Sequence, residues 1–402
     1  MNSLEVRKIF LNYFSEKKHK LVPSASVVPN NDPTLLFTNA GMTQFKDVFL
    51  GAEKLDFSRA TSAQKCIRAG GKHNDLENVG YTLRHHTFFE MLGNFSFGDY
   101  FKEDAIEYAW DLLINHYKLS KDKLWVTVHI EDQESEKIWL EKIGLDKKRI
   151  SKLNEDNFWS MGDTGPCGPC SEIFYDHGDA LEGSPPEEGK DTGDRFVEIY
   201  NIVFMQFNRD IEGNLKPLPK PSVDTGMGLE RISAVMQGTP DNYQTDLFIP
   251  LIKKISELTG EKDLLNPSLR VIADHLRASC FMISDGIAIG NEGRNYVLRR
   301  IIRRALRHAY KLNSENFYVM SKLATYFSDT YKELYPEIEK NNSFIEKALH
   351  EEEEKFGATL NQGMSLLDEE VKKLKGKVIY GDLAFRLYDT FVFPLDMTKD
   401  FA

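Results

Sequence analysis

Two stretches far apart in the sequence each contain an arginine next to glycines. The first runs from Arg68 through a glycine-broken loop to an apolar segment that ends at Met91, and the second covers residues 223–231 and ends at Arg231. If both reach one site, they bring two fixed cations and an aromatic surface around a nucleoside triphosphate. Such a site needs no P-loop, and the sequence contains no GxxxxGK[ST] motif.

The length and composition indicate a folded protein of more than one domain. A chain of 402 residues is too long for one ordinary core, so two or three domains are expected. Its 41% hydrophobic and 28% charged residues are typical of a folded chain. The charged first residues are not those of a secretion signal, and no apolar run reaches the roughly 18 residues that a membrane span needs. We therefore expect a cytoplasmic protein with no membrane partner.

The first half of the chain alternates strands with irregular connections. Residues 4–18 have the pattern of an amphipathic helix, and residues 34–38 are a candidate for a buried strand. Residues 124–130 and 197–207 are rich in β-branched and aromatic side chains and predict two further strands. Residues 176–195, rich in Gly, Pro and acidic side chains, predict a solvated loop. This organisation favours an antiparallel α+β domain over a regular βαβ alternation.

From about residue 243 the pattern becomes helical. Residues 269–282 carry an apolar stripe at helical spacing, and residues 344–374 keep apolar side chains near one face. The sequence therefore predicts a catalytic domain at residues 1–245 and a helical domain at residues 246–402.

A basic helix is expected between residues 294 and 311. Its cations recur at intervals of three and four, while its apolar residues mostly occupy the opposite side. The formal net charge of −11 argues against broad nucleic-acid binding, so an RNA partner would need a local basic face of this kind. A solvated basic face is the alternative. Contact with phosphates is favoured because the seven basic residues from Arg294 to Lys311 are expected to face no acid. The candidate phosphate contacts are Arg300, Arg303, Arg304 and Arg307.

The two arginine stretches resemble motif 2 and motif 3 of class II aminoacyl-tRNA synthetases. Further segments narrow the resemblance to the alanyl-tRNA synthetase family, and it extends over essentially the whole chain. It implies an antiparallel sheet flanked by helices, followed by a helical domain that recognises the tRNA acceptor stem. These segments are Leu35-Leu-Phe-Thr-Asn-Ala-Gly-Met42, Phe88-Phe-Glu-Met-Leu-Gly-Asn-Phe-Ser-Phe-Gly-Asp99, Gly162-Asp-Thr-Gly-Pro-Cys-Gly-Pro-Cys170 and Asn201-Ile-Val-Phe-Met-Gln-Phe207.

The resemblance assigns nucleotide chemistry to both stretches. Arg68 is expected to bridge the α-phosphate of ATP and the carboxylate of alanine, and Arg231 to pack over adenine and reach the triphosphate. Phe89 would form the opposite wall of the adenine slot; strand alternation lets only one of Phe88 and Phe89 face the site, and both could be core. The remaining candidates are a catalytic Lys72 and the ATP contacts Glu77, Met91 and Gly228. Lys72 and Glu77 could equally be ordinary surface-loop residues.

The amino-acid substrate needs a counter-ion for its ammonium group and a pocket that ends after one methyl. Asp224 is the expected carboxylate, because glycines beside it let the backbone approach a ligand. The resemblance adds Trp159, Asn201, Val203 and Gly226 to the pocket, although Trp159 could be a plain core residue. His85 and His86 are interpreted as structural, since phosphoryl chemistry between ATP and a carboxylate needs no general base.

For tRNA, the resemblance assigns recognition of the G·U pair in the acceptor stem to Asn291 and Asp389. Two neighbouring positions depart from the family pattern, with Asn295 and Val392 where glycine is usual. Asparagine tolerates a positive φ moderately well and valine does not, so the loop after Asp389 is expected to be reshaped.

The sequence predicts no protein-bound metal. Four cysteines in a chain of this length do not make a disulfide framework. Cys167 and Cys170 form a lone CxxC, which we interpret as structural thiols, and no HExxH motif occurs. ATP is expected to arrive with Mg²⁺. The family places zinc in a separate editing domain, which we do not expect in residues 1–402.

The expected activity is that of the aminoacylation portion of a longer synthetase. It would convert alanine and ATP to alanyl-adenylate and pyrophosphate and pass the alanyl group to tRNA-Ala, and this portion is expected to be monomeric. One alternative is a paralogue that binds RNA in a regulatory role. Another is an adenylating enzyme that loads a carrier protein. Intact Arg68, Asp224 and Arg231 disfavour the first alternative, and the basic helix disfavours the second.

Overall fold

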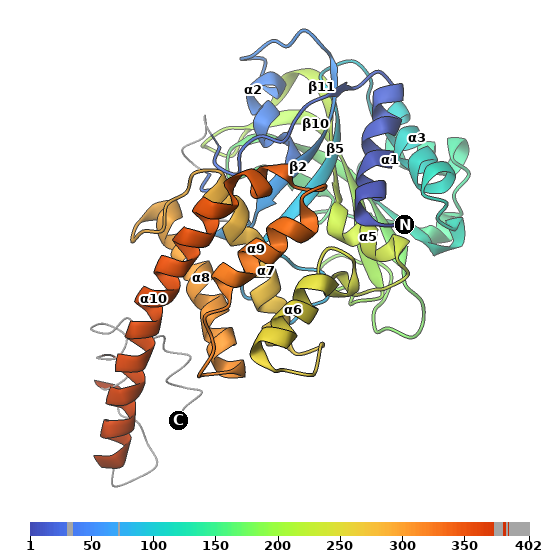
Figure 1. Cartoon of the computed structure of the whole chain (residues 1–402). Coiled ribbons are helices and arrows are strands. Elements are labelled where there is room, and N and C mark those ends of the chain that lie inside the picture. Colours follow the sequence, from blue (N-terminus) through green and yellow to red (C-terminus); the bar gives the residue numbers. More distant parts are fainter. Residues whose placement is uncertain (30–34, 71–72, 374–380, 383–384, 386–402) are drawn as a thin grey trace. The chain divides into compact units, whose positions relative to one another are not determined.

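The structure, a computed structural model, describes residues 1–29, 35–70, 73–373, 381–382 and 385 (Figure 1). The chain divides into two compact units, Met1–Pro250 and Leu251–Ala402. The first unit is built on a large sheet and the second consists of helices in its described part. None of the described helices is both long and apolar enough to pass through a membrane.

A nine-stranded sheet organises the first unit, in the order β1-β2-β5-β11-β10-β9-β6-β7, with β8 paired to β9. Pairing is antiparallel except for β1 with β2 and β6 with β7, which are parallel. The predicted antiparallel pairing is therefore confirmed for most of the sheet, and the sheet as a whole is mixed. The long neighbours β9, β10 and β11 form its centre. The strands are β1 (Lys20–Leu21), β2 (Arg59–Ile67), β5 (Phe88–Ser96), β6 (Leu124–His129), β7 (Ile150–Leu153), β8 (Phe158–Ser160), β9 (Gly165–Asp176), β10 (Phe196–Arg209) and β11 (Leu215–Gly228), with a separate pair β3 (Ala69–Gly70) and β4 (His73–Asn74).

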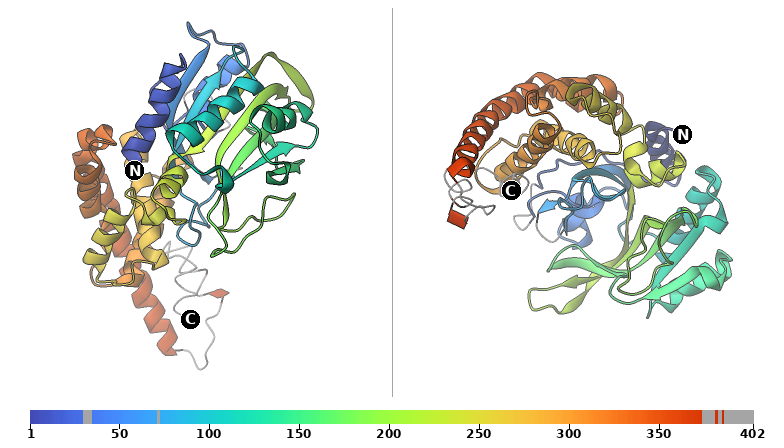
Figure 2. Two further views of the ribbon diagram at one scale, coloured as in Figure 1. Left: turned by 90° about the vertical axis from the view of Figure 1, so that its right-hand side faces the viewer. Right: turned by 90° about the horizontal axis from the view of Figure 1, so that it is seen from below.

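Helices pack against the sheet in the first unit (Figures 1 and 2). Helix α1 begins with a capping box, in which the Asn2 side chain accepts from the Glu5 backbone and the Glu5 side chain accepts from Asn2. Its predicted apolar side is buried, and Phe10 meets the ring of Tyr200 edge-on at 6.2 Å. The helices of this unit are α1 (Ser3–Glu16), α2 (Lys46–Phe49), α3 (Lys102–Asp111), α4 (Gln133–Lys137) and α5 (Leu229–Met236), with short turns η1 (Gly41–Phe45), η2 (Leu112–His116), η3 (Lys121–Lys123), η4 (Ile138–Lys142), η5 (Lys147–Arg149) and η6 (Asn242–Gln244).

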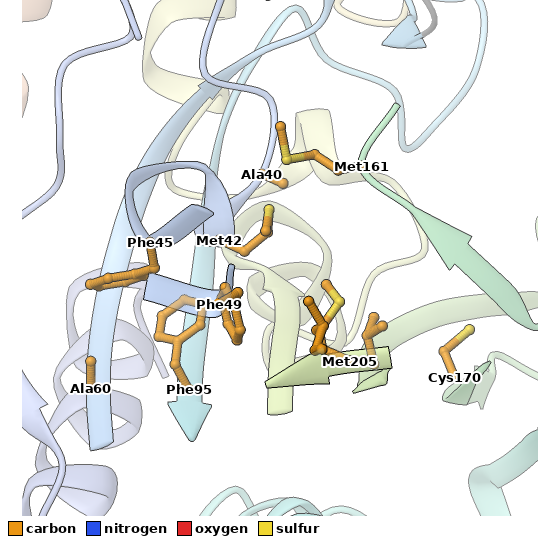
Figure 3. Close-up of a cluster of buried hydrophobic side chains, with 11 residues drawn as sticks. Ala40, Met42, Phe45, Phe49, Ala60, Phe95, Met161, Cys170 and Met205 are labelled. Carbon is orange, nitrogen blue, oxygen red and sulfur yellow. The ribbon is translucent and has the colours of Figure 1, made fainter. Parts of the chain in front are cut away.

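The opposite face of the sheet carries a second apolar cluster, drawn in Figure 3. The ring of Phe45 from η1 lies 4.8 Å from that of Phe95 on β5, and Phe49 from α2 joins the same cluster. Val203 and Cys170 belong to it from β10 and β9.

Most predicted elements are confirmed. The helix predicted at residues 4–18 is α1, and the strands predicted at 124–130 and 197–207 are β6 and β10. Residues 176–195 connect β9 to β10 without regular structure beyond Asp176. The strand predicted at 34–38 is wrong for its described part, residues 35–38. That segment makes single backbone bonds, from Thr38 to Val27 and from Ile67 to Thr38, instead of a ladder.

The second unit packs its helices around α7. The predicted helix at 269–282 is confirmed, but its apolar stripe is wrong, because every residue from Ser268 to Ile283 is buried. In α10, Ile345, Leu349 and Phe356 are fully buried, as their spacing predicts. The helices of this unit are α7 (Pro267–Ser284), α8 (Gly293–Leu312), α9 (Met320–Tyr331) and α10 (Pro336–Lys373), and α6 (Ile249–Thr259) crosses its boundary.

Gly168 on β9 provides a test of how tightly the central strands fit. A Cβ atom there would lie 2.0 Å from the carbonyl oxygen of Phe204, where the register of β9 and β10 shifts. We expect Gly168→Ala to lower the free energy of unfolding by more than about 2 kcal/mol, since backbone must move to admit the methyl. Chemical denaturation measures this value. Gly162→Ala is the control, because its nearest atom would lie 3.6 Å away; equal losses in both variants would contradict the argument.

Candidate functional site

The two arginine stretches meet in one pocket of the first unit. It lies at the ends of β5 and β11, beside the start of α5. Six of the predicted residues contribute to its wall: Arg68, Phe89, Met91, Gly226, Gly228 and Arg231. The other lining residues are Asp75, Arg84, His85, His86, Glu198, Ile199 and Glu230.

The pocket receives one of the two neighbouring phenylalanines. Phe88 is fully buried in the core, whereas Phe89 lines the pocket, as strand alternation requires. The guanidinium carbon of Arg68 lies 5.0 Å from the centre of the Phe89 ring. This cation–π contact was not predicted from the sequence, and it fixes the arginine head group beside the aromatic wall.

Arg231 is held by a carboxylate that the sequence analysis missed. Its Nη1 atom donates to the Glu198 backbone oxygen at 3.0 Å and to Glu198 Oε2 at 3.1 Å. Glu198 pairs with Phe174 and Asn201 pairs with Glu172, and the register shifts between these pairs. Since Phe174 and Glu172 share a face of β9, the shift puts Glu198 and Asn201 on one face although they are three residues apart.

Two carboxylates lie close together beside Arg231. Burial and then the negative charge of Glu198 raise the pKa of Glu172 well above its ordinary value. The raised pKa favours the neutral form of Glu172. Glu198 has the hard oxygen ligands that Mg²⁺ prefers and already faces the pocket, so the residues present fit a Mg²⁺ ion that arrives with a phosphate ligand.

A second group of predicted residues lies along the same sheet face. Asp224 on β11 is directly opposite Val203 on β10, and Val203 is directly opposite Cys170 on β9. Side chains of directly opposed residues point to the same face, so this row crosses three strands. Trp159, on β8, packs against the cluster that contains Val203. This position fits both the predicted role of Trp159 in the pocket and the alternative of a plain core residue.

Two oxygen atoms of the predicted alanine-binding residues are buried without a partner in the described part of the chain. They are Asp224 Oδ1 and Asn201 Oδ1. Burial also raises the pKa of the Asp224 carboxyl well above its ordinary range. Leaving a buried acceptor unpaired costs about 1–3 kcal/mol, so both atoms stand out among the polar groups of the described residues.

Gly226 lies between the two groups of residues. It is opposite Asn201, and a Cβ atom at this position would lie 2.9 Å from the sulfur of Met91. A side chain there would collide with Met91, which lines the pocket. The glycine therefore lets Met91 pack directly against the backbone of β11.

Both histidines of the pocket are tied to neighbouring groups. His85 Nδ1 lies 2.9 Å from Thr82 Oγ1, and burial together with Arg231 and Arg84 lowers its pKa to about 4. His86 Nε2 lies 2.9 Å from Asn242 Nδ2, and its ring stacks on Phe248. A neutral His85 at pH 7 agrees with the structural interpretation of these residues.

Arg84 connects the pocket to the loop at 176–195. Its Nη1 atom donates to Asp194 Oδ1 and to the Gly193 backbone oxygen, both at 2.8 Å. Asp191 lies 3.4 Å from its Nη2 atom. The loop predicted as solvated is thus fixed by one of the pocket arginines.

The structure does not bring every predicted nucleotide contact to the pocket. Glu77 is exposed and is not among the lining residues. Lys72 lies outside the described residues. Asp75 lines the pocket in this segment instead, and no spacing signal in the sequence distinguishes these two acidic residues.

The basic helix α8 differs from the predicted open face. The expectation that its arginines meet no acid is wrong, because Glu352 of α10 lies 2.7 Å from Arg303 Nε. Arg304 is buried, and its Nη1 atom lies 2.9 Å from His275 Nε2. Glu352 belongs to another helix, so the sequence of residues 294–311 alone could not reveal this ion pair. Arg300 is exposed and Arg307 is half-buried.

The predicted recognition residue Asn291 is exposed just before α8. Its side-chain oxygen accepts a hydrogen bond from Arg299, which also pairs with Glu352 at 3.4 Å. Asp389 and Val392 lie outside the described residues. Asn295 is exposed in the first turn of α8, and its backbone oxygen accepts from Gly290 at 3.2 Å.

Comparison with known proteins identifies the class. The family model for class II (A) tRNA synthetases matches residues 5–402, and the chain belongs to that family. Among curated proteins, it is 59% identical over 403 aligned residues to an alanine–tRNA ligase of Idiomarina loihiensis, covering all of this chain and 46% of that protein. It is 60% identical to an alanine–tRNA ligase of Hydrogenovibrio crunogenus, with the same coverage. The chain thus spans about half the length of the curated relatives it matches.

The solved structures matched by this chain include two other synthetases. A pyrrolysyl-tRNA synthetase of Desulfitobacterium hafniense matches at 11% identity and a TM-score of 0.34, over 60% of this chain and 71% of that one. An aspartyl-tRNA synthetase of Entamoeba histolytica matches at 13% identity and a TM-score of 0.33, over 60% and 56%.

The cysteines provide a test of the site's interior. All four are buried, and burial raises the pKa of the thiols of Cys66, Cys167, Cys170 and Cys280. In the described residues, no three His, Cys, Asp or Glu side chains are grouped to hold a metal ion. At pH 8 we expect a thiol-specific disulfide reagent to react with fewer than about one thiol per native protein molecule. The raised pKa values leave little reactive thiolate, and burial keeps the reagent from the sulfur atoms. In denaturant all four should react; rapid reaction of Cys170 in the native state would contradict its placement.

Proposed function

We propose that this chain activates alanine with ATP and transfers the alanyl group to the 3′ end of tRNA-Ala. The observation that carries the proposal is that two groups of predicted residues lie next to each other on one face of the sheet. Arg68, Phe89 and Arg231 line the pocket proposed for the nucleotide, and the buried oxygens of Asp224 and Asn201, which have no partner in the described residues, mark the part proposed for the amino acid. The curated relatives named alanine–tRNA ligases support the choice of amino acid and tRNA.

The first step is an in-line displacement at the α-phosphorus of ATP. A carboxylate oxygen of alanine forms the new P–O bond, the bond to the β-phosphate oxygen breaks, and pyrophosphate leaves with the electron pair. The guanidinium groups of Arg68 and Arg231 would stabilise charge that develops on the phosphate oxygens, and no general base is needed. Mg²⁺, held by the phosphates and by Glu198, would neutralise charge on the leaving pyrophosphate.

The amino-acid part of the site selects by charge and by size. Alanine's ammonium carries three donors, and Asp224 Oδ1 and Asn201 Oδ1 are two buried acceptors without partners in the described residues. Val203 is 2% exposed and is proposed to form the apolar wall beside the methyl group of alanine. Trp159 would close the pocket from β8.

The second unit is proposed to face the tRNA acceptor stem. Asn291 and Arg300 are exposed and support this role, whereas the buried Arg304 and the paired Arg303 do not. Asp389 remains a prediction outside the described residues. We also propose that the chain acts as a monomer in the cytoplasm and that any zinc-dependent editing belongs to a separate part of longer relatives.

Alanine-dependent exchange of labelled pyrophosphate into ATP tests the activation step. A folded preparation without exchange would favour the alternative of a paralogue with a regulatory, RNA-binding role. Exchange without charging of tRNA-Ala would favour the loading of a carrier protein.

Asp224→Asn should weaken the use of alanine far more than the use of ATP. The change removes the charge opposite the ammonium and keeps the shape of the side chain. A charge-assisted contact contributes about 1.5–3 kcal/mol, so the KM for alanine should rise roughly 10- to 100-fold in the exchange assay. Glu188→Asn, at an exposed acid, is the control. Equal increases in the KM values for alanine and ATP would show that Asp224 is structural.

Asn291→Ala should slow the charging of tRNA and leave pyrophosphate exchange nearly unchanged. One lost hydrogen bond to the acceptor stem corresponds to roughly a tenfold decrease in charging efficiency. Asn316→Ala, at another exposed asparagine of the second unit, is the control. A parallel loss of exchange and charging would mean that Asn291 does not act through tRNA.

A further inference from the structure

We propose that Glu172 is a positioning residue for the amino-acid substrate. It holds the amide group of Asn201 so that the amide oxygen, and not the amide nitrogen, faces the ammonium group. The inference rests on the proposed function, because it assigns the ammonium of alanine as the group that Asn201 meets. Glu172 itself need not touch the substrate.

The strand register puts Glu172 directly behind Asn201. Asn201 on β10 is opposite Gly226 on β11 and opposite Glu172 on β9, and Glu172 is opposite Thr127 on β6. These residues form a row on one sheet face, next to the row that contains Asp224 and Val203. The glycine end of the row is open to the site, and the other end continues into the sheet.

One hydrogen bond sets the orientation of the Asn201 amide. Its Nδ2 atom donates to Glu172 Oε1 at 3.0 Å. The carboxyl presents an accepting oxygen at this position whether or not its other oxygen carries a proton, so it selects the amide nitrogen. Asn201 Oδ1 is then turned away from Glu172, and it is buried without a hydrogen-bond partner in the described residues.

Glu172 is held from the far side by a buried polar chain. Its carboxyl is hydrogen-bonded by the side chain of Thr127. Thr127 Oγ1 in turn accepts from Asn157 Nδ2 at 2.9 Å, and both residues are fully buried. Side chains fixed in this way have little rotamer freedom, so the orientation of Asn201 is set before substrate arrives.

The orientation of the Asn201 amide decides whether it attracts or repels the ammonium group of the substrate. With Oδ1 forward, Asn201 offers an acceptor to the ammonium beside Asp224. With the amide reversed, two N–H donors would face a group that has only donors. Correct orientation therefore raises affinity for an α-ammonium group and has no direct effect on the adenine and phosphate contacts.

The experiment compares Glu172→Ala, Glu172→Gln, Asn201→Ala and the double variant Glu172→Ala/Asn201→Ala in the alanine-dependent exchange assay. Each variant is first checked for wild-type secondary structure and thermal midpoint. For Glu172→Ala, we expect the KM for alanine to rise roughly tenfold or more, as for the loss of a hydrogen bond to a charged group, and the KM for ATP to change less than about twofold. Glu172→Gln keeps an accepting oxygen, so its KM for alanine should stay close to the wild-type value. This variant keeps the test usable if Glu172→Ala is unstable.

The double variant shows whether Glu172 acts through Asn201. In that case, adding Glu172→Ala to Asn201→Ala should cause little further loss, and the two effects will not be additive. Additive losses, equal effects on the two substrates or no rescue by glutamine would overturn the inference. Glu188→Gln, an exposed acid outside the row, controls for the loss of one carboxylate. Wild-type protein without alanine-dependent exchange would instead overturn the proposed function, and this inference with it.

Discussion

The register of β9, β10 and β11 is the constraint on which the site depends. Asp224 is opposite Val203, and Val203 is opposite Cys170, so charge and apolar wall share one face. A slip of one residue in either pairing would turn each of these side chains to the other face of the sheet. The opposite face is occupied by the contact of Phe10 with Tyr200, so the slipped arrangement would bury charge in a packed core.

Irregularities in the central strands adjust this register where chemistry requires it. The shift between Glu198 and Tyr200 turns Glu198 toward Arg231 while Asn201 keeps its place in the row beside Asp224. The second shift, between Val203 and Phe207, occurs where Gly168 lies against the Phe204 carbonyl. Regular strands would align the same residues differently, and the nucleotide and amino-acid parts would not share one face.

The sequence was informative where one segment carries its own signal. Apolar spacing predicted α1, and β-branched and aromatic composition predicted β6 and β10. Strand alternation allowed only one of Phe88 and Phe89 to reach the pocket. Prediction from the sequence failed where the partner of a residue lies on a different helix or strand. Glu352 pairs with Arg303 from another helix, and Glu172 and Glu198 depend on a register shift that no periodicity reports. Residues 35–38 have strand-like composition, but no neighbouring strand supplies a ladder.

A pocket for alanine has little apolar surface with which to bind its substrate. One methyl group contributes only about 0.8 kcal/mol on burial, so affinity must come largely from the ammonium and carboxylate groups. In the proposed site, the buried oxygens of Asp224 and Asn201, which have no partner in the described residues, would accept from the ammonium group. The cost of leaving them unpaired would be offset when this cationic donor binds. Electrostatic contacts would then supply most of the affinity, and Val203 and Trp159 would limit the size of the substrate side chain.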